Sequence, residues 1–239
     1  QASGAVSQGA SATAVGVNSG QTSQGATAVA IGSGAGKTTQ GIASVAIGLN
    51  TGETNQGANA TSVGYGSGNN NQSNFGSAFG YYAGRVTQGS AAVAVGYLSG
   101  STNQGASGVA VGQQAGQLNQ SSLGIAIGSF AGASAQGQTA ISIGSGTGQT
   151  SQGTDAIAIG NAAGQTNQAT NGIIISSKGS AIDDTTVGHI HIASTLASLD
   201  YTSAGNWNFT GGTLNVGGSP VTALANGSAS GEMLRWNGS

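Results

Sequence analysis

The segment Ser23–Thr38, SQGATAVAIGSGAGKT, is one copy of a unit that the chain repeats every 16 residues, without insertion, from Ser7 to Thr166. Ten copies follow one another, and residues 1–6 fit the end of a preceding copy. Counted from the first residue of the unit, glutamine holds position two and glycine holds positions ten and fourteen in every copy. Position nine is always Val, Ile or Phe, position seven is mostly Val, Ile or Thr, and position eight is Ala or Ser. A repeat this regular has to be interpreted before any local motif.

The alternation of large, small and large side chains at positions seven to nine is typical of a strand with two different faces. Sixteen residues are too few for a helical repeat and suit one coil of a parallel β-roll or β-helix, in which glycine allows turns with positive φ. The sequence therefore predicts an all-β fold, with a parallel β-solenoid shaft over residues 1–176 and a small strand-and-turn region over residues 177–239. Ten coils stacked about 4.8 Å apart would make a shaft of roughly 48 Å.

Stacking predicts that equivalent side chains form columns along the shaft. Position nine is expected to point inward as an apolar spine shared among associated chains, a structural core of Val15, Ile31, Ile47, Val63, Phe79, Val95, Val111, Ile127, Ile143 and Ile159. Position two is expected to form a ladder of hydrogen-bonded amides, comprising Gln8, Gln24, Gln40, Gln56, Gln72, Gln88, Gln104, Gln120, Gln136 and Gln152. Because so small a coil buries little surface, we expect a homotrimer in which the small residues at positions four, six and eight let neighbouring chains approach closely.

Composition excludes several classes of protein. Only 4% of the 239 residues are charged, and four Lys+Arg against six Asp+Glu give a net charge of -2, which argues against nucleic acid binding. No apolar run is long enough to insert into a membrane, and there is no cysteine to form a disulfide. IGSGAGKTT at Ile31–Thr39 imitates a phosphate-binding loop, but its first glycine is displaced by one residue. Because the chain starts at Gln1 rather than Met, we expect a processed product or a fragment.

The units VAIGSGAG at Val29–Gly36 and IAIGNAAG at Ile157–Gly164 resemble the head repeats of trimeric autotransporter adhesins, whose related units build a parallel β-roll trimer. The longer 16-residue form is more similar to fibre proteins of tailed bacteriophages and large algal viruses. In those fibres such arrays precede strand-rich segments, like NWNFTG from Asn206 here, and often a C-terminal chaperone domain that trimerises the chain and is then cleaved off. This resemblance implies a location on a virion or extracellular surface.

Two groups of residues are candidate sites. His189 and His191 lie two apart in a predicted strand, so three chains could bring six imidazoles together around a transition metal at the trimer axis; solvent-facing or hydrogen-bonded histidines are the alternative. Positions eleven and twelve vary between copies and hold aromatic residues that could contact a host-surface glycan, a protein receptor or a neighbouring subunit: Tyr65, Tyr81, Tyr82, Tyr97 and Phe130. We assign no catalytic residue and no other cofactor.

The sequence therefore predicts a structural and adhesive fibre protein rather than an enzyme: a rigid trimeric shaft, on a tail or surface fibre, that presents host-receptor binding. An ice-binding solenoid is the alternative, because position sixteen is threonine in six copies, although Asn70, Val86, Leu118 and Ser134 interrupt that column. A bacterial surface adhesin head is a second alternative. An enzyme that cleaves polysaccharide would require clustered carboxylates, which six acidic residues scarcely supply.

Overall fold

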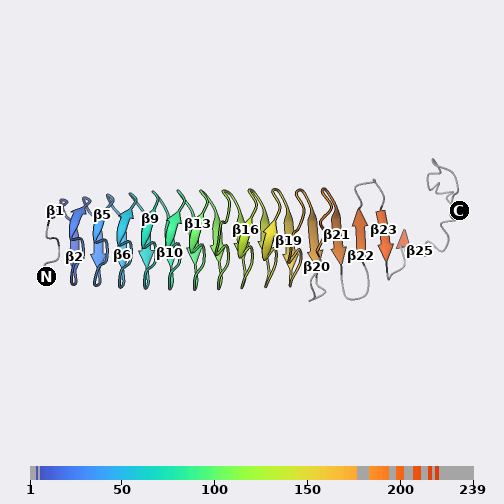
Figure 1. Ribbon diagram of the computed structural model, residues 1–239, viewed down its shortest axis with the longest axis horizontal. Helices are drawn as coiled ribbons and strands as arrows, with labels where there is room; N and C mark the ends of the chain where they lie inside the picture. Colours follow the sequence, from blue (N-terminus) through green and yellow to red (C-terminus); the bar gives the residue numbers. More distant parts are fainter. Residues whose placement is uncertain are drawn as a thin grey trace.

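The computed structural model describes residue 4, residues 6–176 and 183–193, and the backbone of four strands at 198–201, 207–210, 215–216 and 219–220. These residues form the predicted all-β solenoid, with about 11 turns and a repeat of about 16 residues. Figure 1 shows the coils stacked side by side along one straight axis, from the N-terminal coil in blue to β21 in orange. The described part of the chain contains no helix long and apolar enough to cross a bilayer.

One wall of the shaft is a 14-stranded sheet, here called the long sheet. Its strands pair in parallel as far as β21, and β22 and β23 then continue the sheet in antiparallel pairing. In order they are β2 (Thr13–Val15), β4 (Val29–Ile31), β6 (Val45–Ile47), β8 (Thr61–Val63), β10 (Ser77–Phe79), β12 (Val93–Val95), β14 (Val109–Val111), β15 (Ile125–Ile127), β17 (Ile141–Ile143), β19 (Ile157–Gly160), β20 (Ile173–Ser176), β21 (Ile190–Ala193), β22 (Ser198–Tyr201) and β23 (Trp207–Thr210).

The opposite wall, here called the glutamine wall, is built from the residues around position two. Its strands are β1 (Val6–Gln8), β3 (Thr22–Gln24), β5 (Thr38–Gln40), β7 (Thr54–Gln56), β9 (Asn70–Gln72), β11 (Val86–Gln88), β13 (Thr102–Gln104), β16 (Ser134–Gln136) and β18 (Thr150–Gln152). Single bridges from Leu118 to Thr102 and to Ser134 carry the wall across the coil between β13 and β16. A separate antiparallel pair joins β24 (Asn215–Val216) to β25 (Ser219–Pro220).

The register between neighbouring coils is constant along the shaft. Val29 pairs with Val45 on the long sheet, and Thr38 pairs with Thr54 on the glutamine wall, so each residue lies beside its counterpart 16 positions away. Between β20 and β21 the offset becomes 17, because Ile173 pairs with Ile190. Parallel stacking therefore continues to β21, beyond residue 176, and ends where β22 reverses direction.

Each coil turns through backbone of positive φ, and two glycine positions show why the repeat requires glycine there. Gly48, at position ten, has φ of +133°, and a Cβ on it would lie 2.3 Å from the carbonyl oxygen of Gly64 in the next coil. Gly52, at position fourteen, has φ of +54°, and its Cβ would lie 2.9 Å from the amide of Gln56. The first glycine allows axial stacking of the backbone, and the second leaves the space that the glutamine side chain occupies.

The interior of the shaft is lined with alanine, serine, threonine and glutamine. From the second copy on, the residues at positions six, eight and thirteen are buried, as Ala28, Ala30 and Ala35 are in one coil. The prediction that position nine points inward is wrong for the chain itself. Seven of its ten residues are exposed, namely Val15, Ile31, Ile47, Phe79, Val95, Ile127 and Ile143, and Val63, Val111 and Ile159 are half-buried. The residues at positions six and eight are inside, so they are not available to neighbouring chains as predicted.

The physical reason for this inversion is the width of the coil. The glutamine side chain crosses the whole interior, because the Nε2 of Gln104 donates a hydrogen bond to the carbonyl oxygen of Val93 on the opposite wall at 2.8 Å. Only a small residue fits beside it at position eight. The coil that contains Ile174 supports this explanation. Ile174 replaces alanine at position eight and is buried, and the residue at the place of the next glutamine is Asp184, which has a shorter side chain.

The glutamines form the amide ladder that the sequence predicts. From Gln40 to Gln152 each Nε2 donates to the Oε1 of the glutamine in the next coil, the last acceptor being Gln168, over distances of 2.9 to 3.2 Å. The Nε2 of Gln24 instead donates to the carbonyl oxygens of Thr13 and Ala28. The Nε2 atoms of the ladder also donate to backbone carbonyls of the long sheet, as Gln136 does to Ile125. Gln8, at the N-terminal end, is exposed, and its Nε2 instead bonds the carbonyl oxygen of Ala12. Because a buried amide must be satisfied, the ladder fixes both the register and the separation of the two walls.

Candidate functional site

Three tyrosines at position eleven stack along one corner of the shaft, beside the long sheet. The ring centroids of Tyr65 and Tyr81 are 5.1 Å apart with an interplanar angle of 10°, and those of Tyr81 and Tyr97 are 5.4 Å apart at 14°. Tyr82, at position twelve, meets Tyr65 and Tyr81 edge-on at 5.1 and 4.5 Å. We call these four residues the tyrosine ladder. It arises because the axial repeat of a parallel solenoid, about 4.8 Å, is close to the separation at which aromatic rings stack.

Arg85 completes this corner. Its Cζ atom lies 4.5 Å from the centroid of the Tyr82 ring, which is the geometry of a cation–π contact. Arg85 is exposed, and no carboxylate pairs with it in the part of the chain that the structure describes. Position fifteen, which holds Arg85, lies three residues after position twelve, so the two side chains meet on the same corner of the coil.

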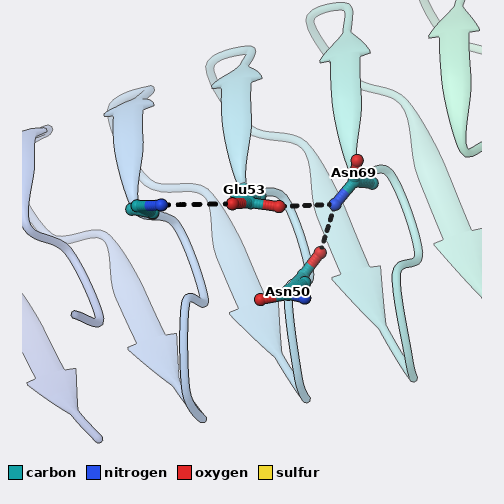
Figure 2. A network of polar contacts seen from close by, with 4 residues as sticks. Asn50, Glu53 and Asn69 are labelled. Atoms are coloured by element: carbon teal, nitrogen blue, oxygen red, sulfur yellow. Dashed lines mark hydrogen bonds and ion pairs between the residues drawn. The ribbon is translucent and has the colours of Figure 1, made fainter. Parts of the chain in front are cut away.

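The column at position fifteen contains a second polar network, in the three coils that precede the coil of Arg85. Figure 2 shows Glu53 between two partners: the Nζ of Lys37 lies 3.4 Å from its Oε1, and the Nδ2 of Asn69 donates to its Oε2 at 3.0 Å. Asn69 also donates to the carbonyl oxygen of Asn50 at 2.8 Å. Lys37 therefore has a carboxylate partner, whereas Arg85 has none among the residues that the structure describes.

The pKa values of two hydroxyls of the tyrosine ladder, those of Tyr65 and Tyr81, are raised above the usual value. The pKa of Tyr65 is raised, first by a side-chain hydrogen bond with Tyr82 and then by the proximity of its charge. The pKa of Tyr81 is raised mainly by partial desolvation. At neutral pH Tyr65 and Tyr81 therefore present hydroxyl groups that can both donate and accept hydrogen bonds.

The other residues predicted at variable positions are not part of this cluster. Phe130 lies at position twelve, two coils beyond Tyr97, and is half-buried. Leu49 is exposed at position eleven, one coil before Tyr65, and extends the corner as an aliphatic neighbour. Sequence reasoning identified all four tyrosines but missed Arg85, although the constant spacing of three from Tyr82 was a usable signal.

The predicted histidine pair is divided between two environments. The Nδ1 of His189 lies 2.8 Å from the Oδ2 of Asp184. His191 lies in β21 opposite Ile174, which is an inward position of the coil. Among the residues that the structure describes, no group of three or more His, Cys, Asp or Glu side chains is placed to hold a metal ion. Metal binding by His189 and His191 at a trimer axis therefore stays a prediction.

The outer face of the long sheet carries two columns of mostly apolar side chains along the shaft. It consists of the side chains at positions seven and nine of β2 to β20, which are Val, Ile, Thr, Ser or Phe throughout. Position nine is exposed by 38% at Ile31, 41% at Phe79 and 39% at Ile127. The threonines of position sixteen, on the opposite wall, are half-buried at Thr22, Thr38, Thr54 and Thr102. They make a less regular surface than this face.

In comparisons with known proteins, no family model, no curated protein and no solved structure matches this chain.

Proposed function

We propose that this chain is the rigid shaft of a structural and adhesive fibre on a virion or other extracellular surface, and that it self-associates as a homotrimer. One observation carries the proposal: the outer face of the long sheet is a straight apolar surface that the chain itself leaves uncovered. The resemblance of the repeat to viral fibres and adhesin heads is consistent with this role.

The size of the face supports association. Ten strand spacings of about 4.8 Å and a width of about 10 Å give a flat area of roughly 500 Å². The largest apolar patches on monomeric proteins cover about 300 to 600 Å² of accessible surface, and patches of that size commonly mark interaction sites. A soluble chain with this surface is stabilised when another copy covers it.

A parallel trimer covers the face with one kind of contact. If three shafts turn their outer faces to a common axis, identical coils lie at the same height and position nine of each copy meets position nine of the others. The predicted shared apolar spine then forms between the chains rather than inside each one. The mechanical function follows from this assembly, because a stiff shaft projects a binding end and several copies convert weak contacts into avidity.

Light scattering after size-exclusion chromatography tests the proposal. The expected mass is three times the 22.6 kDa of one chain. The double variant Ile127→Asp/Ile143→Asp places charges on the face and is expected to give monomers with an unchanged β circular dichroism spectrum, because both side chains point outward. The matched control Gln138→Asp/Thr154→Asp, at exposed position four of the neighbouring coils, is expected to remain trimeric. A single-chain mass for the unsubstituted protein at all concentrations would refute self-association, and a stable dimer would refute the trimer.

A further inference from the structure

The charged and aromatic residues of the shaft are unevenly distributed. Lys37 and Arg85 are the only lysine and arginine among the described residues, and both lie in the column at position fifteen. Lys37 is paired with Glu53, whereas Arg85 has no carboxylate partner among those residues and stands against the tyrosine ladder. A single unpaired cation beside four tyrosines, on a surface of mostly small neutral side chains, marks this corner as different from the rest of the shaft.

We propose that the tyrosine ladder and Arg85 bind an acidic polysaccharide, a linear polymer whose sugars carry carboxylates. This inference rests on the proposed adhesive function and names the class of ligand. The strand of sugar would lie along the shaft axis, with one carboxylate on the Arg85 guanidinium and its hydroxyl groups against the tyrosine hydroxyls and ring edges.

The orientation of the rings determines how such a ligand is bound. Tyr65, Tyr81 and Tyr97 stack on one another, so the ring faces between them are already covered and contact with a ligand falls to their edges and hydroxyls. Tyr65, Tyr81 and Tyr97 are exposed by 39%, 44% and 49%, so these edges are accessible. The hydroxyls recur once per coil, which suits a polymer whose own hydroxyl groups recur along its length. Tyrosine hydroxyls with an ordinary pKa of about 10 are donors at neutral pH, and the raised pKa values of Tyr65 and Tyr81 do not change this.

Charge selects the acidic class of polymer. The guanidinium of Arg85 offers a planar set of donors that matches a carboxylate, and such charge-assisted hydrogen bonds are about twice as strong as neutral ones. A neutral polysaccharide would leave the cation without a partner. A nucleic acid would need many cations along its backbone, and the described shaft supplies two.

Isothermal titration calorimetry with polygalacturonate as the probe tests the inference. Arg85→Gln is expected to weaken binding about tenfold or more, as is typical when a charge-assisted hydrogen bond is removed. Tyr81→Ser/Tyr97→Ser is expected to weaken it at least as much, because it removes the centre and one end of the ladder. The control Lys37→Gln removes the other cation of the same column and is expected to leave affinity unchanged. Methyl-esterified polygalacturonate, which lacks the charge, is expected to bind about tenfold more weakly.

Four results would overturn the inference: no binding by the unsubstituted chain, equal binding of the methyl ester, full affinity of Arg85→Gln, or equally tight binding of poly-glutamate, which would indicate an acidic protein partner. A change of mass in the tyrosine variant would show instead that the ladder is a contact between copies. Mass is measured on the same samples. A trimer that does not bind polygalacturonate would contradict this inference alone. A monomer that binds it would contradict only the trimeric assembly.

Discussion

Replacing Gln104 with alanine tests the central claim of the fold, that buried amides hold the two walls of the shaft together. The Gln104 side chain is 2% exposed, and its Nε2 bonds the carbonyl oxygens of Val93 at 2.8 Å and Gly108 at 3.3 Å and the Oε1 of Gln120 at 3.1 Å. Its Oε1 accepts a hydrogen bond from Gln88 at 3.1 Å. The substitution removes all four bonds at once.

The cost can be worked out from the groups left behind. Gly108 still accepts a hydrogen bond from the backbone of Val93, and the Nε2 of Gln88 keeps two carbonyl partners. The Oε1 of Gln120 loses the donor that the ladder supplies, and an unsatisfied buried polar atom costs about 1 to 3 kcal/mol. The cavity left by the missing side chain adds a penalty of about 2 kcal/mol, at the low end for truncation of a large buried side chain to alanine. We therefore expect a loss of about 3 to 5 kcal/mol in the free energy of unfolding.

Urea unfolding followed by circular dichroism measures this loss. Gln8→Ala is the matched control, because Gln8 has the same place in the repeat but is exposed at the end of the shaft and makes one side-chain hydrogen bond. We expect the control to lose less than about 1 kcal/mol, as for other exposed substitutions. Equal losses for the two variants would refute the conclusion that the ladder stabilises the interior.

Three further substitutions test other parts of the fold. Gln104→Glu places a carboxyl group in the interior, where burial raises its pKa. The folded state is least affected below the unfolded pKa of about 4.3 and loses stability as pH rises through the folded pKa. A melting temperature that does not fall between pH 4 and 8, relative to that of Gln8→Glu, would contradict this. Gly48→Ala should destabilise the shaft far more than Gly146→Ala in thermal melts. Both residues have positive φ, but only at Gly48 would the added Cβ strike backbone, whereas a Cβ at Gly146 would have its nearest neighbour 3.8 Å away. Ala94→Ile should prevent folding or lower the melting temperature strongly, since Ala94 is fully buried opposite the amide column; native-like stability on denaturant titration would show that the interior is wider than described.

The sequence was sufficient to predict the coil, its length and the amide ladder, because all three follow from a period of 16 with invariant glutamine and glycine. It was insufficient to say which side of the strand faces inward. A two-residue alternation places Val29 and Ile31 on the face opposite Ala30 but does not identify the buried face. The general rule that large apolar residues are buried favoured the wrong face here, since it takes no account of the space that Gln40 occupies inside the coil.

The candidate site, like the fold, could be predicted from the sequence only in part. Tyrosines at positions 65, 81 and 97 are separated by one period, so a stack follows once the coil is accepted. Arg85 was missed because its contact with Tyr82 depends on how the corner between positions twelve and fifteen folds. The histidines were considered as a pair because they lie two apart, whereas the structure gives His189 an aspartate partner and puts His191 in register with an inward position.

The inverted packing explains how so small a coil can be both regular and adaptable. Inside, the glutamine, alanine and glycine columns accept almost no change, because the amides from Gln40 to Gln168 are bonded from coil to coil and a glycine Cβ would strike backbone or amide. Outside, a residue at position nine or eleven changes only the surface, so Phe79 or Tyr81 can replace isoleucine or serine without altering the stack. A shaft of this kind keeps its shape while its faces diverge, and the proposed trimer contact and the tyrosine ladder are both features of these outer columns. The rigidity that the proposed fibre needs and the variability that the proposed recognition needs therefore reside in different positions of the same 16-residue unit.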